Sequence, residues 1–309
     1  MTADIGTTDQ ALAACGVTAQ TLTAAQKESL DRNGYLVLPP DQDYWRSKGT
    51  SLEEFRTILD DLSQKEGWRG GSEGKEDRVR PDKPLDPGSN RLGNLIEKHR
   101  AFRACITHPV VLAAARYIIG GEMKCSGVDM REPQKGKGEQ HLHIDWLPRQ
   151  SASDSYDNVF CGIFLDEMTK ANGAIRVIPG THTKLDWPNE YIDVFTRQQN
   201  ELQVEGPPGL MVVMNANTWH GGALNINGAR RRTIYVDYRA RRLPQLLNQK
   251  RYLSAATVAS LTPAERYLLA VRDNDPTDET VSVGPGDAYR ARYGSSYGRK
   301  EPAAAGGGS

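Results

Sequence analysis

Two histidines, one aspartate and one arginine have the spacing of a metal site with an adjacent anion clamp. His143 and Asp145 are separated by one residue, His220 lies 77 residues after His143, and Arg231 lies 11 residues after His220. Two imidazoles and one carboxylate can occupy one face of an octahedral Fe(II) ion and leave the opposite positions open. A guanidinium pairs bidentately with a carboxylate, here the carboxylate of a 2-oxo-acid cosubstrate. The pattern predicts an Fe(II) centre with an arginine anchor.

Strand geometry must position these side chains. On a β-strand, alternate residues point to the same face, so a strand over residues 139–146 turns His143 and Asp145 the same way. His220 follows the β-rich run GLMVVMNA and is expected where that strand ends. A His-x-Asp motif alone occurs readily by chance, and the prediction depends on its combination with the later histidine and arginine.

The remaining pattern predicts helices around a β core. Residues 22–40 indicate a helix followed by a strand, residues 50–65 and 98–119 two further helices, and residues 251–272 a helical C-terminal part. Short β-runs separated by turn residues fill the region of about 122–240, which is typical of an antiparallel barrel or sandwich. We expect one domain over residues 1–300 and a flexible tail over 301–309.

Residues 66–92 are rich in Gly, Pro and charged residues and lack a hydrophobic period. Two interpretations stay open, a solvated surface loop and an active-site lid, because long loops within compact domains are often functional.

Several segments of the chain together resemble the phytanoyl-CoA dioxygenase-like (PhyH) branch of Fe(II)/2-oxoglutarate oxygenases. The resemblance rests on RNGYLVLP near the N-terminus, LHIDW around the first motif, NGAIRVIPGTH at residues 172–182, and His220 followed by Asn225 and Arg231. It implies a double-stranded β-helix (jelly-roll, cupin-like) core, iron held by His143, Asp145 and His220, and 2-oxoglutarate bound by Arg231 with Asn225. Hydroxylation is then the default outcome, with O2 as oxidant; desaturation, epimerisation and cyclisation are the other outcomes.

The arginine register and the second cosubstrate anchor stay open. Arg230, Arg231 and Arg232 are consecutive, and a slip of one residue reverses which side chain points inward. Spacing favours Arg231 over Arg232. Members of the family often carry a hydroxyl residue two positions after the distal histidine, where this chain has Gly222.

Three alternative functions are compatible with parts of the same pattern. A cupin-type metal enzyme that does not use 2-oxoglutarate would share the core and add His141 as a ligand. A non-catalytic binding protein could retain the barrel. A basic surface patch of Arg230–Arg232 with Arg239, Arg241 and Arg242 would meet a phosphate or nucleic acid.

Composition limits the partners. Lys+Arg and Asp+Glu are both 39, so the formal net charge is zero and a nucleic-acid partner is not expected. The four cysteines show no regular spacing, no secretory signal is visible, and no apolar run approaches the ~20 residues of a membrane helix. We expect a cytoplasmic monomer or homodimer.

Substrate identity is the least constrained part of the prediction. Arg131, Trp146 and Asn94 are candidate substrate contacts, and Arg78 and Arg80 add charge to the proposed lid. With few large apolar residues in that segment, a small polar metabolite of bacterial specialised metabolism fits better than a long acyl chain.

Overall fold

Two antiparallel sheets form the centre of the fold in a computed structural model, which describes residues 5–73 and 88–275. The strands are β1 (Tyr35–Leu38), β2 (Ser89–Leu92), β3 (Met123–Pro133), β4 (Asn158–Phe164), β5 (Arg176–Val177), β6 (Leu202–Gln203), β7 (Met211–Asn215), β8 (His220–Gly221) and β9 (Thr233–Ala240). The larger sheet has the order β1-β7-β4-β9-β3-β2, and the smaller one has the order β6-β5-β8. Within the described ranges, the two sheets remain separate and do not close into a barrel.

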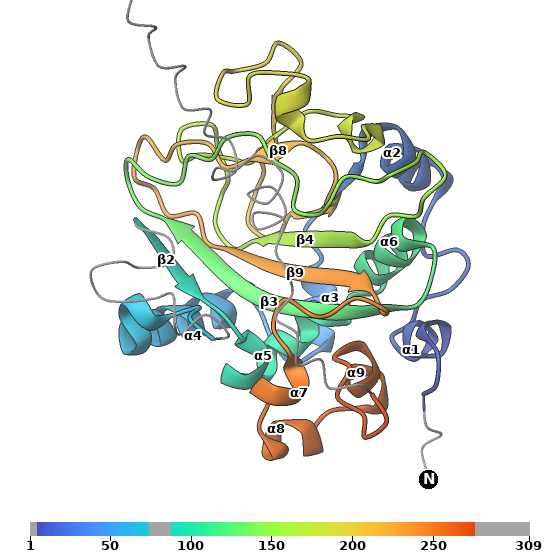
Figure 1. The fold of residues 1–309 in the computed structure, drawn as a ribbon. Coiled ribbons are helices and arrows are strands. Elements are labelled where there is room, and N and C mark those ends of the chain that lie inside the picture. The colour runs from blue at the N-terminus through green and yellow to red at the C-terminus, as the bar shows by residue number, and fades with distance from the viewer. Residues whose placement is uncertain (1–4, 74–87, 276–309) are drawn as a thin grey trace, which may run out of the picture.

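Helices cover one face of the larger sheet. They are α1 (Thr8–Ala14), α2 (Ala24–Asn33), α3 (Gln42–Ser47), α4 (Leu52–Glu66), α5 (Leu95–Lys98), α6 (Pro109–Ile119), α7 (Gln249–Tyr252), α8 (Ala255–Ala259) and α9 (Pro263–Leu268). Short 3-10 helices are η1 (Gly67–Arg69), η2 (Arg100–Ile106), η3 (Thr181–Thr183) and η4 (Pro188–Glu190). In Figure 1, α4, α5, α7 and α9 lie below the larger sheet, whereas β8 lies above it.

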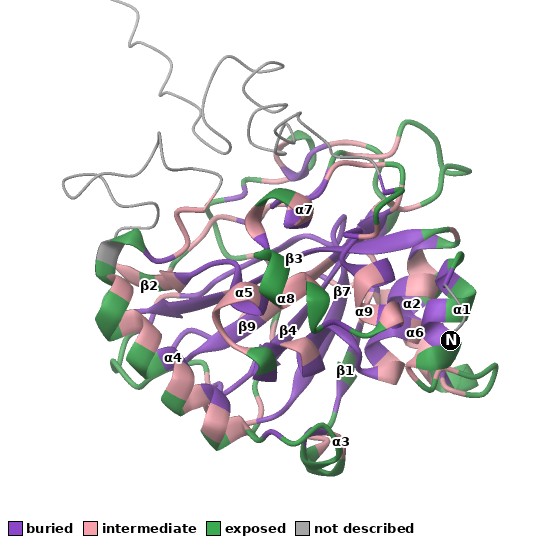
Figure 2. Ribbon diagram, turned by 90° about the horizontal axis from the view of Figure 1, so that it is seen from below, coloured by how far each residue is buried: buried purple, intermediate pink, exposed green. Residues whose placement is uncertain are grey.

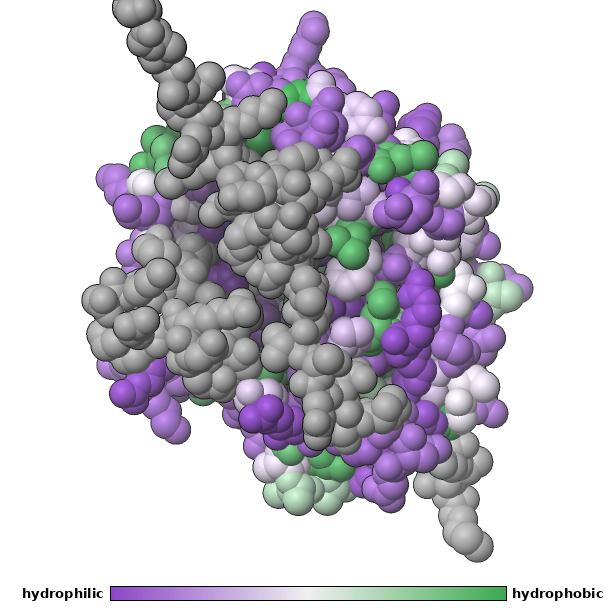
Figure 3. Space-filling model, viewed as in Figure 1, coloured by the Kyte–Doolittle hydropathy of each residue, from purple (hydrophilic) through white to green (hydrophobic). Residues whose placement is uncertain are grey.

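Strand alternation divides the apolar residues between two cores. On β4, Val159, Cys161 and Ile163 face the helices and join the larger core, whereas Phe160 and Phe164 face the smaller sheet. Seen from the helical side in Figure 2, the central strands β3, β4, β7 and β9 are mostly buried, whereas α4 carries exposed residues along its outer face. Charged and polar residues predominate on the face shown in Figure 3, and hydrophobic residues occur there in small separate groups. The smaller core fills part of the space between the sheets, and its member Phe160 also lines the cavity described below.

The N-terminal helix and strand follow the sequence prediction. Thr23 caps α2 through a capping box, Gly34 ends it with a φ of 82°, and β1 begins at the next residue. The helix predicted over residues 50–65 is confirmed as α4.

The single helix predicted over residues 98–119 is wrong. The chain forms α5, η2 and α6 instead, because His99 is extended (φ −159°) and Pro109 lacks the N–H that would continue a helix. The C-terminal helix is likewise divided, into α7, α8 and α9.

Among the described residues, no single helix is long and apolar enough to cross a membrane; η2 and α6 meet that test only as a pair bent by 48°.

Two further predictions need correction. Residues 139–146 form no continuous strand, because only His143 pairs with a neighbour, through an isolated bridge to His220. Within residues 66–92, Ser89–Leu92 form β2 at the edge of the larger sheet, which the absence of a hydrophobic period concealed. Residues 74–87, with Arg78 and Arg80, and the tail 301–309 lie outside the described residues.

Gly34→Ala is expected to lower the free energy of unfolding by about 2–4 kcal/mol. A positive φ costs a non-glycine residue about 1 kcal/mol, and an added Cβ would lie 2.4 Å from the hydroxyl oxygen of Thr218. Urea unfolding of the purified protein measures the loss.

Gly120→Ala is the matched control, since Gly120 also ends a helix with positive φ (73°) but has nothing within 4 Å of the added Cβ. A loss of about 1 kcal/mol is expected there. Equal losses at the two glycines would contradict the contact argument.

Candidate metal centre and its cavity

The bridge between His143 and His220 brings the three predicted ligands together. The two residues exchange backbone N–H···O bonds of 2.9 and 3.0 Å. His220 Nε2 lies 3.3 Å from one carboxylate oxygen of Asp145, and His143 Nε2 lies 3.5 Å from the other. All three ligand atoms lie within 4.8 Å of one another. Across residues 5–73 and 88–275, no second such group of histidine, cysteine or carboxylate side chains occurs.

Both imidazoles are oriented by backbone carbonyls. His143 Nδ1 lies 2.8 Å from the carbonyl oxygen of His141, and His220 Nδ1 lies 2.9 Å from that of Thr218. A carbonyl only accepts, so we assign the proton to Nδ1 in each ring, which leaves the Nε2 lone pair for a metal ion. Leu142 and Ile144 point the other way into an apolar cluster, so alternation holds although the strand is absent.

The charges of the group suit a divalent cation. Burial alone would raise the pKa of Asp145, but His220 and His143 hold that pKa well below its usual range. Burial lowers the pKa of His220, yet Asp145 outweighs it and the net direction is upward. A bound divalent metal ion would stabilise the Asp145 carboxylate in the way that a protonated His220 does, and it would replace that proton. Two nitrogen donors and one carboxylate on one side of a cavity fit Fe(II).

A cavity of about 870 Å³ between the sheets contains these ligands. Phe160 of β4 packs against the His220 ring at 5.1 Å between centroids, so the larger sheet supports a ligand carried by the smaller one. Most of the residues that line the cavity have polar or charged side chains. Its charged residues besides the metal ligands are Arg91, Asp129, Arg131, Glu139, Arg176, Arg231, Asp237 and Arg239.

The structure separates the three consecutive arginines. Arg231 is buried, lines the cavity and donates from Nη2 to the carbonyl of Ala223 at 3.3 Å. Arg230 and Arg232 do not line the cavity and form ion pairs with Asp60. Of these three consecutive arginines, Arg231 is therefore the one that shares the cavity with the metal ligands.

Asn225 does not face the cavity. Its side-chain nitrogen donates to the carbonyls of Pro133 and Ala229, and its oxygen accepts the N–H of Gly228. A buried amide requires such partners, and here they are backbone groups of the surrounding loops. In this structure the Asn225 side chain therefore joins the surrounding loops and does not line the cavity with Arg231.

Two of the three expected substrate contacts also lie off the cavity wall. Asn94 is buried and donates to the carbonyl of Tyr252. The indole N–H of Trp146 donates to Asp157, and the Arg239 guanidinium lies 4.5 Å from its ring centroid. Arg131 lines the cavity as expected.

Strand β9 contributes cavity residues that the sequence prediction missed. Ile234, Val236 and Tyr238 face the helices, so Tyr235, Asp237 and Arg239 face the cavity. Burial raises the pKa of Asp237 to about 6, against the attraction of Arg239, whose Nε lies 3.1 Å away. Alternation along TIYVDYRA was the available signal.

The alternative of a basic surface patch finds no support in the described residues. Arg232 and Arg239 are buried, and the arginines pair with carboxylates: Arg230 and Arg232 with Asp60, Arg239 with Asp237, Arg241 with Asp275, and Arg242 with Asp157. Such pairing leaves little excess charge for a phosphate backbone.

His141 lies beside the metal group without belonging to it. Its ring centroid is 5.7 Å from that of His143 and 5.5 Å from that of Phe195, an exposed aromatic residue on the cavity wall. Burial lowers the pKa of His141 to about 4. The cupin alternative requires His141 as a fourth ligand. Among the described residues, the converging ligand atoms belong to His143, Asp145 and His220 and do not include His141.

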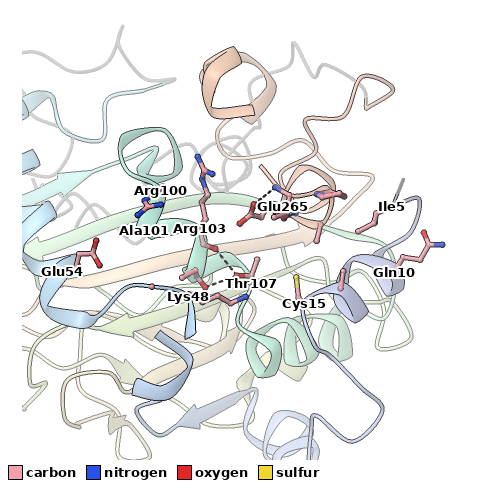
Figure 4. A pocket seen from close by; sticks show the side chains of 16 residues that line it. Ile5, Gln10, Cys15, Lys48, Glu54, Arg100, Ala101, Arg103, Thr107 and Glu265 are labelled. Carbon is pink, nitrogen blue, oxygen red and sulfur yellow. Dashed lines mark hydrogen bonds between the residues drawn. The ribbon is translucent and has the colours of Figure 1, made fainter. Parts of the chain in front are cut away.

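A second cavity, of about 650 Å³, lies among the helices (Figure 4). Cys15, Lys48 and Arg103 line it. Burial raises the pKa of the Cys15 thiol to about 11, so the reactive thiolate is scarce at neutral pH. With no converging metal ligands, this cavity lacks the chemistry of the first.

Comparisons with known proteins agree with the geometry. A sequence model of the phytanoyl-CoA dioxygenase (PhyH) family matches residues 30–233. The chain is 22% identical to an ectoine dioxygenase of Bordetella parapertussis (77% of this chain, 81% of the relative). It is 24% identical to a probable alpha-ketoglutarate-dependent hypophosphite dioxygenase of Stutzerimonas stutzeri (62% and 72%).

Solved structures share the fold. HygX from Streptomyces hygroscopicus, with nickel and 2-oxoglutarate bound, has a TM-score of 0.56 at 17% identity and covers 72% of this chain and 89% of its own. EctD from S. alaskensis, with iron bound, has a TM-score of 0.53 at 18% identity, with coverages of 72% and 78%. The two sheets with flanking helices thus form the predicted jelly-roll core.

Replacing any one of His143, Asp145 and His220 by alanine is expected to abolish stoichiometric Fe(II) binding, because each supplies one of three protein ligands. Anaerobic calorimetry with Fe(II) measures the loss, and circular dichroism checks that the fold is retained.

His141→Ala is the control, since His141 shares the cavity but not the ligand group. This variant should bind Fe(II) about as well as the parent. A large loss at His141 with little loss at His143 would contradict the assigned ligand set.

Proposed function

Because this chain belongs to the phytanoyl-CoA dioxygenase (PhyH) family of Fe(II)- and 2-oxoglutarate-dependent oxygenases, we propose that it hydroxylates a small polar metabolite. The observation that carries the proposal is the shared cavity, where three metal ligands and the buried Arg231 face one space. Relatives named for ectoine, hypophosphite and L-proline act on small polar molecules, which is the substrate class proposed here.

Each part of the proposed chemistry is assigned to named residues. His143, Asp145 and His220 would hold the iron and leave its cavity side open. Iron with 2-oxoglutarate and O2 supplies the oxidising power when bound, and succinate and CO2 are released. Arg231 would pair with the far carboxylate of 2-oxoglutarate, since its planar fork matches a carboxylate.

The surroundings of Gly222 leave no room for the hydroxyl side chain that members of the family often carry at this position. A Cβ there would lie 2.5 Å from the carbonyl oxygen of Gly138 and 3.1 Å from the side-chain oxygen of Gln140. Gln140 accepts the Gly222 N–H at 3.1 Å and lines the cavity. We therefore assign the second cosubstrate contact to Gln140 or to Tyr235, the cavity tyrosine of β9, in place of a side chain at position 222.

Two parts of the proposal rest on sequence and composition. The cysteines Cys15, Cys105, Cys125 and Cys161 are free thiols, which suits the reducing cytoplasm proposed as the location. A monomer or homodimer without a nucleic-acid or membrane partner completes the proposal.

Arg231→Ala is expected to raise the dissociation constant of 2-oxoglutarate by roughly a hundredfold while Fe(II) binding stays near the parental level. Loss of a buried charge-assisted pair has about that effect. Arg231→Lys should restore only part of the affinity, because an ammonium lacks the planar fork. Calorimetry with iron present measures the dissociation constants, and succinate release measures turnover.

Arg230→Ala and Arg232→Ala are the matched controls, since both lie off the cavity wall and pair with Asp60. Their 2-oxoglutarate affinity should change little. The proposal would be wrong if all three variants bind 2-oxoglutarate like the parent and the parent releases no succinate. A cupin-type enzyme that does not use 2-oxoglutarate would then be the better interpretation.

A further inference from the structure

Strand β8 lies between β5 and the segment that carries two of the metal ligands, residues 139–146, here called the ligand segment. His220 of β8 pairs with Val177 of β5 on one side and with His143 on the other. The ligand segment forms no continuous strand of its own. Contacts with neighbouring residues must therefore hold it in the conformation that brings the ligands together.

The side chain of Arg176 spans β8 and reaches the ligand segment. Arg176 of β5 pairs in register with Gly221, and its Nη2 donates to the carbonyl of Gln140. A Cβ at Gly221 would lie 2.8 Å from the carbonyl oxygen of His141, 3.0 Å from that of Gln140 and 3.4 Å from Nη2 of Arg176. Glycine at position 221 thus permits the close approach of the guanidinium and the ligand segment.

The other end of the Arg176 guanidinium is fixed by a buried carboxylate. Nη1 of Arg176 lies 3.3 Å from Oε2 of Glu201, and each of the two side chains is only 3% exposed. Glu201 pairs with Arg197 as well. A desolvated guanidinium is stable where it has such partners, and a paired, buried one has little freedom to move. Arg176 is therefore a rigid link rather than a mobile surface charge.

The loop that carries Glu201 contacts the ligand segment directly too. The carbonyl of Val194, in the same loop, accepts the backbone N–H of Leu142 at 3.0 Å, and the Val194 side chain packs in the apolar cluster that contains Leu142. The loop thus supports the segment at Leu142 through its backbone and at Gln140 through Arg176. Both contacts lie just before His143 in the chain.

We propose that Arg176 is a positioning residue for the metal centre, which holds the ligand segment in its iron-binding geometry through the carbonyl of Gln140. The inference rests on the ligand set of the proposed function and adds to it a residue that does not touch the metal ion. Without the guanidinium, the Gln140 carbonyl loses a charge-assisted bond and the segment gains freedom, which Fe(II) binding must then remove. Groups that orient metal ligands in this way affect metal affinity although they do not bind the ion.

The test compares Arg176→Gln, Arg176→Lys and Glu201→Gln with the parent. Arg241→Gln is the matched control, because Arg241 also pairs with a carboxylate (Asp275, 2.6 Å) and donates to a backbone carbonyl (Tyr267, 2.9 Å) but does not line the cavity. Anaerobic calorimetry with Fe(II) alone measures metal affinity. The visible absorption of the Co(II)-loaded protein reports ligand geometry, and urea unfolding measures stability.

Arg176→Gln is expected to raise the dissociation constant of Fe(II) by about 10- to 100-fold and to change the Co(II) absorption. Glu201→Gln should have a smaller effect in the same direction. Arg176→Lys should fall between Arg176→Gln and the parent, because an ammonium can reach one partner but lacks the planar fork that serves both. Arg241→Gln should lower stability while its Fe(II) affinity and Co(II) absorption stay near those of the parent.

Parental Fe(II) affinity and Co(II) absorption in the Arg176 variants, or an equal change in Arg241→Gln, would overturn the proposal and leave Arg176 a purely structural role. If Arg176→Gln does not fold, Arg176→Lys and Glu201→Gln decide by the same criteria. Unchanged Fe(II) affinity with weaker 2-oxoglutarate binding would make Arg176 a ligand contact, which also overturns it.

A separate readout tests the proposed function. The visible charge-transfer band that forms when 2-oxoglutarate is added to the anaerobic Fe(II) protein reports cosubstrate binding. Its absence in the parent would count against the use of 2-oxoglutarate, whereas the Fe(II) titrations would still decide the role of Arg176.

Discussion

Two backbone hydrogen bonds join His143 to His220 and hold the two candidate histidine ligands side by side. The segment that carries His143 and Asp145 has no other β-bridge among the described residues. Two further backbone bonds flank this one, from the N–H of Gln140 to the carbonyl of Gly222 at 3.0 Å and from the N–H of Asp145 to the carbonyl of Ala216 at 2.8 Å. The carbonyls of His141 and Thr218 then orient the two rings. Local backbone geometry thus determines which nitrogen each histidine presents, before any metal ion binds.

The polar wall of the cavity follows from the alternation of β9 and its neighbours. Apolar side chains on one face fill the helical core, and charged side chains on the other face are buried between the sheets. Buried charges are tolerated where they are paired, as Arg176 is with Glu201 and Arg239 with Asp237. A wall of this kind discriminates strongly, because a substrate without matching polar groups displaces water and leaves desolvated groups unsatisfied.

The convergence of the three candidate ligands could be predicted from the sequence, because it needs only local alternation and one later histidine. The sequence was also sufficient for α2, α4 and most of the strands, where caps and apolar periods are clear. Asn225 and Trp146 do not line the cavity, and spacing could not show this, because it does not reveal whether a polar group faces a cavity or bonds to a neighbouring loop. Arg91 was missed because β2 is a short edge strand whose position depends on tertiary contact with the turn at Gly70.

Gly34 connects the N-terminal part of the chain to the metal ligands. Its carbonyl accepts the hydroxyl of Thr218 and the backbone N–H of Asn215, and the carbonyl of Thr218 in turn bonds to the His220 ring. The helix and strand that flank Gly34 therefore belong to the outer support of the iron, although they lie far from it in sequence. A fragment reduced to the β region of about residues 122–240 would retain every ligand and lose the contact that steadies one of them. In this fold the catalytic unit is larger than the set of residues that touch the metal.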